Sequence, residues 1–219
     1  VQIKEPLPLD VLYAEQHQSG TVGKLWENHH KEFADFVTKH VKTEVLEIGG
    51  GHGILAAKVN EKNALKWTIL EPNPTPRDDC PAEYIKGFFD ESFELPNGID
   101  TVVHSHFFEH LYEPNVFLKI ISDKLLLGDV QIFSVPNMEV MLERKYTNCL
   151  NFEHTVFFTQ EVIEHLLSKH GFEIVEKRLF REDHSIFYAT KRTNDVQVKP
   201  LQPNYEKNKK LFEEFIKYH

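Results

Sequence analysis

The chain has 219 residues, of which 41% are hydrophobic and 27% are charged. These proportions are ordinary for one soluble globular domain with a proper core. A formal net charge of −9 argues against a nucleic-acid partner, which needs a basic surface. There are two cysteines without metal spacing, no secretory pattern at the start and no apolar run of about 20 residues. We therefore expect a cytoplasmic protein without a membrane segment.

The first half of the chain alternates between helical and extended patterns. Residues 1–20 contain Pro6 and Pro8 and predict an amino-terminal arm. Residues 21–40 predict an amphipathic helix, because apolar residues recur there at helical spacing. A second helix is expected over Ile54–Asn60, after a glycine-rich turn. Strands are predicted over Glu44–Ile48, Lys66–Leu70, Ala82–Lys86 and Ile99–Val103.

The second half continues the alternation with one interruption. Residues 137–158 show no clean period and are long for a connection, which usually marks function. Residues 191–203 predict a polar linker. Helices are predicted from Pro114 to about Leu126, over Thr159–Lys169 and over Asn204–His219, and strands over Val130–Val135, Phe172–Lys177 and Ser185–Thr190. The alternation predicts an α/β fold, a mostly parallel seven-stranded sheet with helices on both faces.

A glycine-rich turn follows the first predicted strand, where ligands of open α/β sheets bind. Its four glycines, at positions 49, 50, 51 and 53, let the backbone pass close to a ligand. Residues 51–56 also satisfy the G-x-G-x-x-A pattern of dinucleotide sites, and Glu71 lies near the acidic spacing of that pattern. Glu47 favours another ligand, because a carboxylate inside the strand suits a cationic head group.

Residues 47–53, Glu-Ile-Gly-Gly-Gly-His-Gly, resemble the E-x-G-x-G-x-G motif of class I S-adenosylmethionine-dependent methyltransferases. The resemblance implies a Rossmann-like fold over residues 21–190, in which residues 21–40 form a lid-like helix, with residues 191–219 as linker and carboxyl-terminal helix. It implies S-adenosyl-L-methionine as cofactor and S-adenosyl-L-homocysteine as product. The cofactor-binding residues it implies are Glu47, Gly49, Gly51, Gly53, Glu71, Asn73, Phe88, Phe89, Asp90 and Ser105.

Two histidine-containing segments are candidates for the chemistry of the acceptor. Residues 105–110 follow the fourth predicted strand, and residues 148–158 belong to the long aperiodic stretch. Methyl transfer needs a positioned nucleophile, and a base where its proton is not acidic. Histidine suits that task because its pKa lies near neutrality. The candidate bases are His154, His110 and His106, each of which could instead have a structural role, and the candidate substrate contacts are Tyr13, His29, Asn137, Arg144, Tyr146 and Glu153.

Several of these segments together are similar to the deoxysugar C-methyltransferases. The similarity rests on Gly87–Phe89, His106–His110, Pro136–Asn137 and Glu153–Phe158, and it implies a substrate-side histidine base. The chain does not show that family's cysteine-rich zinc-binding domain or most of its carboxyl-terminal domain. Asn151 and Phe152 also replace the tyrosine and histidine that usually precede the Glu-His pair.

We therefore expect a methyltransferase acting on a small polar metabolite: a sugar, a nucleotide sugar or a phosphorylated intermediate of saccharide biosynthesis. Arg144 and Lys145, beside Tyr146, could hold a phosphate or carboxylate of that substrate. No metal site is expected, because no helix carries an H-x-x-x-H pair with a supporting carboxylate. A monomer or homodimer is expected. The alternatives are an NAD(P)-dependent oxidoreductase and a non-catalytic methyltransferase-like subunit.

Overall fold

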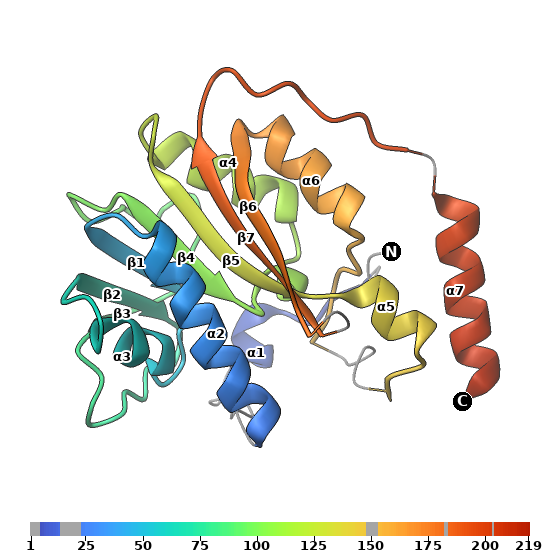
Figure 1. Cartoon of the computed structure of the whole chain (residues 1–219), viewed down its shortest axis with the longest axis horizontal. Helices are drawn as coiled ribbons and strands as arrows, with labels where there is room; N and C mark the ends of the chain where they lie inside the picture. The colour runs from blue at the N-terminus through green and yellow to red at the C-terminus, as the bar shows by residue number, and fades with distance from the viewer. Residues whose placement is uncertain (1–4, 14–22, 148–152, 182–183, 203) are drawn as a thin grey trace.

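The strands of the chain form one twisted sheet (Figure 1). The computed structural model describes all residues except 1–4, 14–22, 148–152, 182–183 and 203. The strand order is β3-β2-β1-β4-β5-β7-β6, and β7 is antiparallel to both of its neighbours. The predicted mostly parallel, seven-stranded sheet is therefore confirmed. The strands are β1 Glu44–Ile48, β2 Lys66–Glu71, β3 Glu83–Lys86, β4 Thr101–Ser105, β5 Val130–Pro136, β6 Phe172–Phe180 and β7 Ser185–Arg192.

Helices cover both faces of the sheet. One face packs against α2 (Lys24–His40) and α3 (Ile54–Asn60), and the other against α4 (Pro114–Lys124) and α6 (Gln160–Lys169). No helix among the described residues is long and apolar enough to cross a membrane. The remaining helical elements are α1 Leu9–Leu12, the 3₁₀ turn η1 Phe108–His110, α5 Met138–Glu143 and α7 Tyr205–Tyr218.

The central strands are apolar because both of their faces are covered. Side chains alternate along β1, so that Leu46 and Ile48 enter the core beneath α4 and α6, whereas Val45 enters the core beneath α2 and α3. Glu47 shares the face of Val45 and is 3% exposed, which makes it a carboxylate in an apolar layer. A buried carboxylate is costly unless it is paired, so its position points to function.

Several predicted boundaries differ from the structure, most of them by one or two residues. β4 begins two residues later than predicted, β6 continues three residues further, and α1 lies inside the predicted arm. The helix α5 was also not predicted, since it occupies six residues of a segment whose whole length shows no period. Three buried residues of α5 nevertheless have helical spacing: Met138, Met141 and Leu142.

The carboxyl-terminal helix α7 packs against α5, beside the sheet (Figure 1). Phe215 is 5% exposed and contributes to a small core with the buried residues of α5. Leu211 and Phe212 pack against the same core, whereas Ile216 is 68% exposed. The apolar side of this helix that carries Leu211, Phe212 and Phe215 therefore has an intramolecular partner.

We expect the replacement Phe215→Ala to lower the free energy of unfolding by about 3 kcal/mol, because it removes a buried ring. Ile216→Ala, on the exposed side of the same helix, should change it by less than about 0.5 kcal/mol. Urea unfolding monitored by circular dichroism measures both. Equal effects of the two replacements would contradict the packing of α7 on α5.

Candidate active site

A cavity of about 790 Å³ opens at the carboxyl ends of the central parallel strands. The glycine turn after β1, the end of β2 and the segments after β3 and β4 all line it. Leu9 of α1 and Tyr13 line it from the amino-terminal side, and Trp26 and His30 from α2. This is the edge at which open α/β sheets bind ligands.

The glycine turn runs close to other groups. Gly49 has φ +71°, and a Cβ there would lie 2.9 Å from the ring of Phe107. Gly53 has φ +77°, and its Cβ would lie 2.2 Å from Sγ of Cys80. Gly49 and Gly51 line the cavity, but Gly53 does not. Gly53 is the residue before α3 and has a left-handed backbone conformation, which glycine adopts without steric strain. Its role is therefore structural.

Two carboxylates lie at the end of the cavity that the glycine turn lines. Oε2 of Glu47 accepts a hydrogen bond of 2.8 Å from the indole Nε1–H of Trp67. Burial raises the pKa of Glu47 to about 7; that hydrogen bond opposes the rise, and the charge of Glu71 adds to it. Oε2 of Glu71 accepts a hydrogen bond of 3.1 Å from the backbone N–H of Gly51, yet burial raises the pKa of Glu71 as well. Such a pair is suited to a ligand that carries positive charge.

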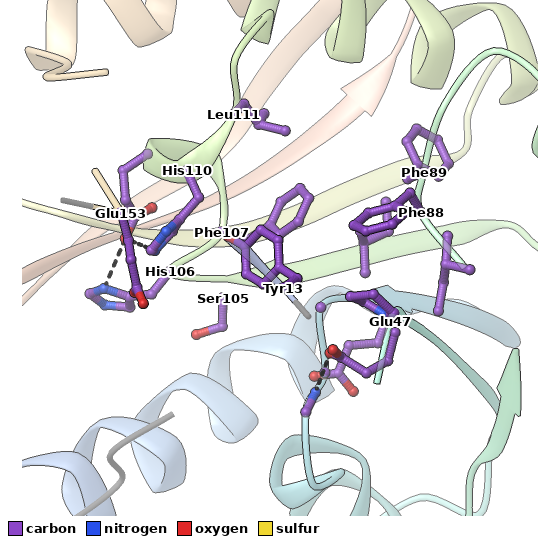
Figure 2. A pocket seen from close by; sticks show the side chains of 18 of the residues that line it. Tyr13, Glu47, Phe88, Phe89, Ser105, His106, Phe107, His110, Leu111 and Glu153 are labelled. Atoms are coloured by element: carbon purple, nitrogen blue, oxygen red, sulfur yellow. Dashed lines mark hydrogen bonds and ion pairs between the residues drawn. The ribbon is translucent and has the colours of Figure 1, made fainter. Parts of the chain in front are cut away.

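The segment after β3 supplies aromatic and acidic groups. Figure 2 shows Phe88 and Phe89 on one side of the cavity, with Tyr13 near Phe88 at a ring-centroid distance of 6.4 Å. Phe88 is 39% exposed, whereas Phe89 also packs on Phe117 in the core. Asp90 lines the cavity too, while its Oδ1 accepts hydrogen bonds from residues 92 and 93. Phe88 is therefore the ring with more surface available to a ligand.

Asn73 connects the end of β2 to the amino-terminal segment. Its side-chain amide donates a hydrogen bond to the backbone carbonyl of Tyr13. The hydroxyl of Tyr112 donates to the carbonyl of Leu7. These contacts hold α1 beside the cavity, which Leu9 and Tyr13 line.

The three candidate bases lie together at the opposite end of the cavity. His106 directly follows β4, and His110 and His154 have ring centroids 5.1 Å apart. His106 has φ +47°, an uncommon conformation for a non-glycine residue, as is often found at functional sites. Burial lowers the pKa of His106 well below its ordinary value, and burial also lowers that of His110 although Glu109 opposes it.

The hydroxyl of Ser185 contacts the ring of His106. Nε2 of His106 lies 2.9 Å from Oγ of Ser185, which in turn lies 2.6 Å from Nδ1 of His184. The hydroxyl can donate to one imidazole and accept from the other. Nδ1 of His106 lies 3.4 Å from Oε1 of Glu109. Ser105 lines the cavity, and its Oγ lies 2.7 Å from Oγ of Ser134.

Four of the proposed substrate contacts do not line the cavity. His29 is fully buried in the core, in ring contact with Phe33 and Phe187. Asn137 is buried, and its backbone N–H donates to the carbonyl of His184. Arg144 and Tyr146 follow α5 and are exposed. Of the proposed contacts, Tyr13 and Glu153 line the cavity.

Sequence reasoning did not single out two cavity residues, Glu109 and His184. Glu109 is 1% exposed. It belongs to the sequence pattern His-x-x-Glu-His, which was the only sequence feature that could have indicated a functional role for it. His184 directly precedes β7 and its neighbour Ser185, which is 79 residues after His106 in the chain. No local sequence pattern therefore indicates that His184 lies near His106. The sequence predicted no metal site, yet Glu109, His110 and His154 have ligand atoms within 4.8 Å of one another.

Comparisons with known proteins agree with this architecture. A family model described as a methyltransferase domain matches residues 21–177. An uncharacterised methyltransferase from Bacillus cereus is 28% identical over 170 residues, which cover 69% of this chain and 79% of that protein. The chain therefore belongs to the methyltransferase-domain family.

Solved structures show the same fold. A SAM-dependent methyltransferase from Thermotoga maritima has a TM-score of 0.62 at 17% identity, over 84% of this chain and 98% of that one. The magnesium protoporphyrin IX methyltransferase of Synechocystis, with bound S-adenosylhomocysteine, has a TM-score of 0.57 at 13% identity, over 82% and 90%. With the family match, they identify a class I S-adenosylmethionine-dependent methyltransferase. S-adenosylmethionine is its cofactor.

The raised pKa of Glu47 predicts a pH-dependent affinity for S-adenosylhomocysteine, whose amino group is cationic. Protonated Glu47 is neutral, so binding requires loss of its proton below pH 7. We expect the affinity to rise with pH by up to about tenfold per unit below pH 7 and to level off above it. Calorimetric titration between pH 5.5 and 8.5 measures this.

Glu47→Gln should bind S-adenosylhomocysteine more weakly and with little pH dependence. Glu94→Gln, at an exposed position outside the cavity, should behave as the unmodified protein does. An unchanged pH profile in Glu47→Gln would assign the titration to another group.

Proposed function

We propose that this enzyme methylates a small, hydroxyl-rich metabolite such as a sugar. The single observation that carries the proposal is that different kinds of side chain line the two ends of the cavity. Carboxylates and the glycine turn occupy one end, and a group of histidines with Glu109 occupies the other. The second end offers polar groups to a small acceptor. We propose a monomer or homodimer in the cytoplasm that does not act on nucleic acid, in keeping with the net charge of −9.

The charges around the cavity narrow the class of acceptor. Among the described residues that line it, none is lysine or arginine, whereas five are acidic: Glu47, Glu71, Asp90, Glu109 and Glu153. Arg144, proposed from the sequence to hold a phosphate, does not line it. A neutral sugar thus suits the cavity better than a phosphorylated intermediate does. A nucleotide sugar would need to keep its diphosphate outside the cavity.

We propose that Glu47 and the glycine turn hold the methionine part of the cofactor. Glu71 would accept hydrogen bonds from the ribose hydroxyls, and Phe88 would stack on adenine. When bound, S-adenosylmethionine supplies a methyl group on a positively charged sulfur, already activated for displacement. The protein has therefore to position the acceptor and accept its proton.

A histidine of the group His106, His110 and His154 would take that proton. The position of His106 favours it, since it follows β4 directly beside Ser105. Its burial keeps the imidazole neutral at pH 7, which is the form that can accept a proton. Ser185 and His184 could pass the proton onward, because the hydroxyl lies between the two rings.

A screen of free sugars, sugar phosphates and nucleotide sugars, read out as formation of S-adenosylhomocysteine, tests the acceptor class. Against the best acceptor, His106→Gln should lower kcat by about 10²- to 10⁴-fold, as expected for loss of a general base. Its affinity for S-adenosylhomocysteine should stay within about twofold of the unmodified protein's, because His106 lies at the other end of the cavity.

His170→Gln is the matched control, since this histidine pairs with Asn115 outside the cavity. It should retain full activity. Full activity in His106→Gln would move the role to His110 or His154, or show that no base is needed. Binding of S-adenosylhomocysteine without turnover of any acceptor would instead support a non-catalytic methyltransferase-like subunit.

A further inference from the structure

We propose that Glu109, His110 and His154 form a binding site for a divalent transition-metal ion at the acceptor end of the cavity. Each residue offers one ligand atom, and the three atoms lie within 4.8 Å of one another. This inference deepens the proposed function and rests on it for the identity of the reaction, but the metal site can be tested without an acceptor.

The carboxylate of Glu109 is the observation that points to a cation. Its residue is 1% exposed, and neither of its oxygens has a hydrogen-bond partner among the described residues. The nearest basic groups are the imidazoles of His106 at 3.4 Å and His110 at 4.0 Å, and neither makes a hydrogen bond to the carboxylate. A buried carboxylate without a partner is unfavourable, and a bound cation would remove that cost.

The backbone holds these residues in place. The 3₁₀ turn η1 places Glu109 and His110 next to each other at the end of β4. The carbonyl of Glu109 accepts hydrogen bonds of 3.0 and 3.2 Å from the N–H groups of Thr155 and Val156. The hydroxyl of Thr155 donates to the carbonyl of Leu111. These bonds attach the segment that carries His154 to η1, so the fold itself brings together side chains more than 40 residues apart in the chain.

The arrangement of side chains leaves room for a substrate oxygen. All three residues line the cavity, and the rings of His110 and His154 are nearly perpendicular, at 82°. Figure 2 shows His106, His110 and Glu153 grouped on one side of the cavity, across from Phe88 and Phe89. A site with three protein ligands keeps further coordination positions open, as catalytic metal sites do. Those positions would face the acceptor.

The ligand set selects the class of metal. Two imidazoles and one carboxylate suit Zn²⁺, Mn²⁺ or Fe²⁺, whereas Mg²⁺ and Ca²⁺ prefer sites made of oxygen alone. Coordination of the acceptor hydroxyl would lower its pKa. The O–H bond then breaks with its proton passing to His106, an O–C bond forms to the methyl group, and the C–S bond breaks with its electron pair going to sulfur. His106 is outside the three-residue group and stays available as the base.

Calorimetric titration of the EDTA-treated protein with Zn²⁺, Mn²⁺ and Mg²⁺ tests the site. We expect about one ion of Zn²⁺ or Mn²⁺ per chain, and at least tenfold weaker binding of Mg²⁺. Glu109→Gln and His154→Gln should each weaken binding of the preferred ion at least tenfold. His170→Gln, which removes a histidine outside the cavity, should bind it as the unmodified protein does. Equal binding by all four proteins, or binding by none, would overturn the proposal.

Thermal unfolding gives a second readout that a purely structural role would not produce. Without metal, Glu109→Gln should unfold at no lower a temperature than the unmodified protein, because the carboxylate that it replaces has no hydrogen-bond partner among the described residues. The preferred ion should raise the unfolding temperature of the unmodified protein and of His170→Gln, but not that of Glu109→Gln. A lower unfolding temperature for Glu109→Gln in the absence of metal would show that the carboxylate is a structural group and count against the site. If that variant does not fold, His154→Gln decides the matter by its loss of ion binding.

The two proposals fail separately. Full methyl transfer by the EDTA-treated protein would overturn the metal site and leave the proposed function standing. Failure of every acceptor, alongside ion binding that depends on Glu109 and His154, would overturn the acceptor class and support the metal site.

Discussion

The proposed cofactor end of the cavity depends on a carboxylate buried beneath a glycine turn. Glu47 is held from β2 by the indole of Trp67. A Cβ at Gly50 would lie 2.8 Å from the carboxyl carbon of Glu47, so the turn can pass over the carboxylate only because residue 50 is glycine. Glu71 in turn accepts the N–H of Gly51. The two acids, the turn and the ends of two neighbouring strands therefore form one unit.

The two ends of the cavity bury different ionisable groups: two carboxylates at one end, and a carboxylate with several histidines at the other. At the cofactor end, burial disfavours ionisation of Glu47 and Glu71, and a cationic ligand would reverse this. At the acceptor end, burial disfavours both the charge on Glu109 and the charged forms of the histidines around it. Burial thus works against ionisation of the side chains at both ends of the cavity. This arrangement suits methyl transfer, in which a cationic cofactor meets an acceptor that must lose a proton.

Much of the cofactor end could be predicted from the sequence. The motif from Glu47 to Gly53 is contiguous, and Glu71 lies at the end of the next strand, so local order and the parallel pairing of β1 with β2 were enough to place them. Gly53 is the exception, because its role beside Cys80 depends on packing. The helix α5 was missed for a different reason: a segment of six residues, three of them buried, is too short for a helical period to be detected.

The sequence by itself determined the α/β fold, the glycine turn and the cofactor, because periodicity and a contiguous motif are local properties of the chain. Only the tertiary structure decided the acceptor end. His154 meets Glu109 through backbone hydrogen bonds made by Thr155 and Val156, and His184 reaches His106 through Ser185. The same packing buries His29 and leaves Arg144 outside the cavity. Contacts between segments far apart in the chain depend on packing that no local pattern encodes.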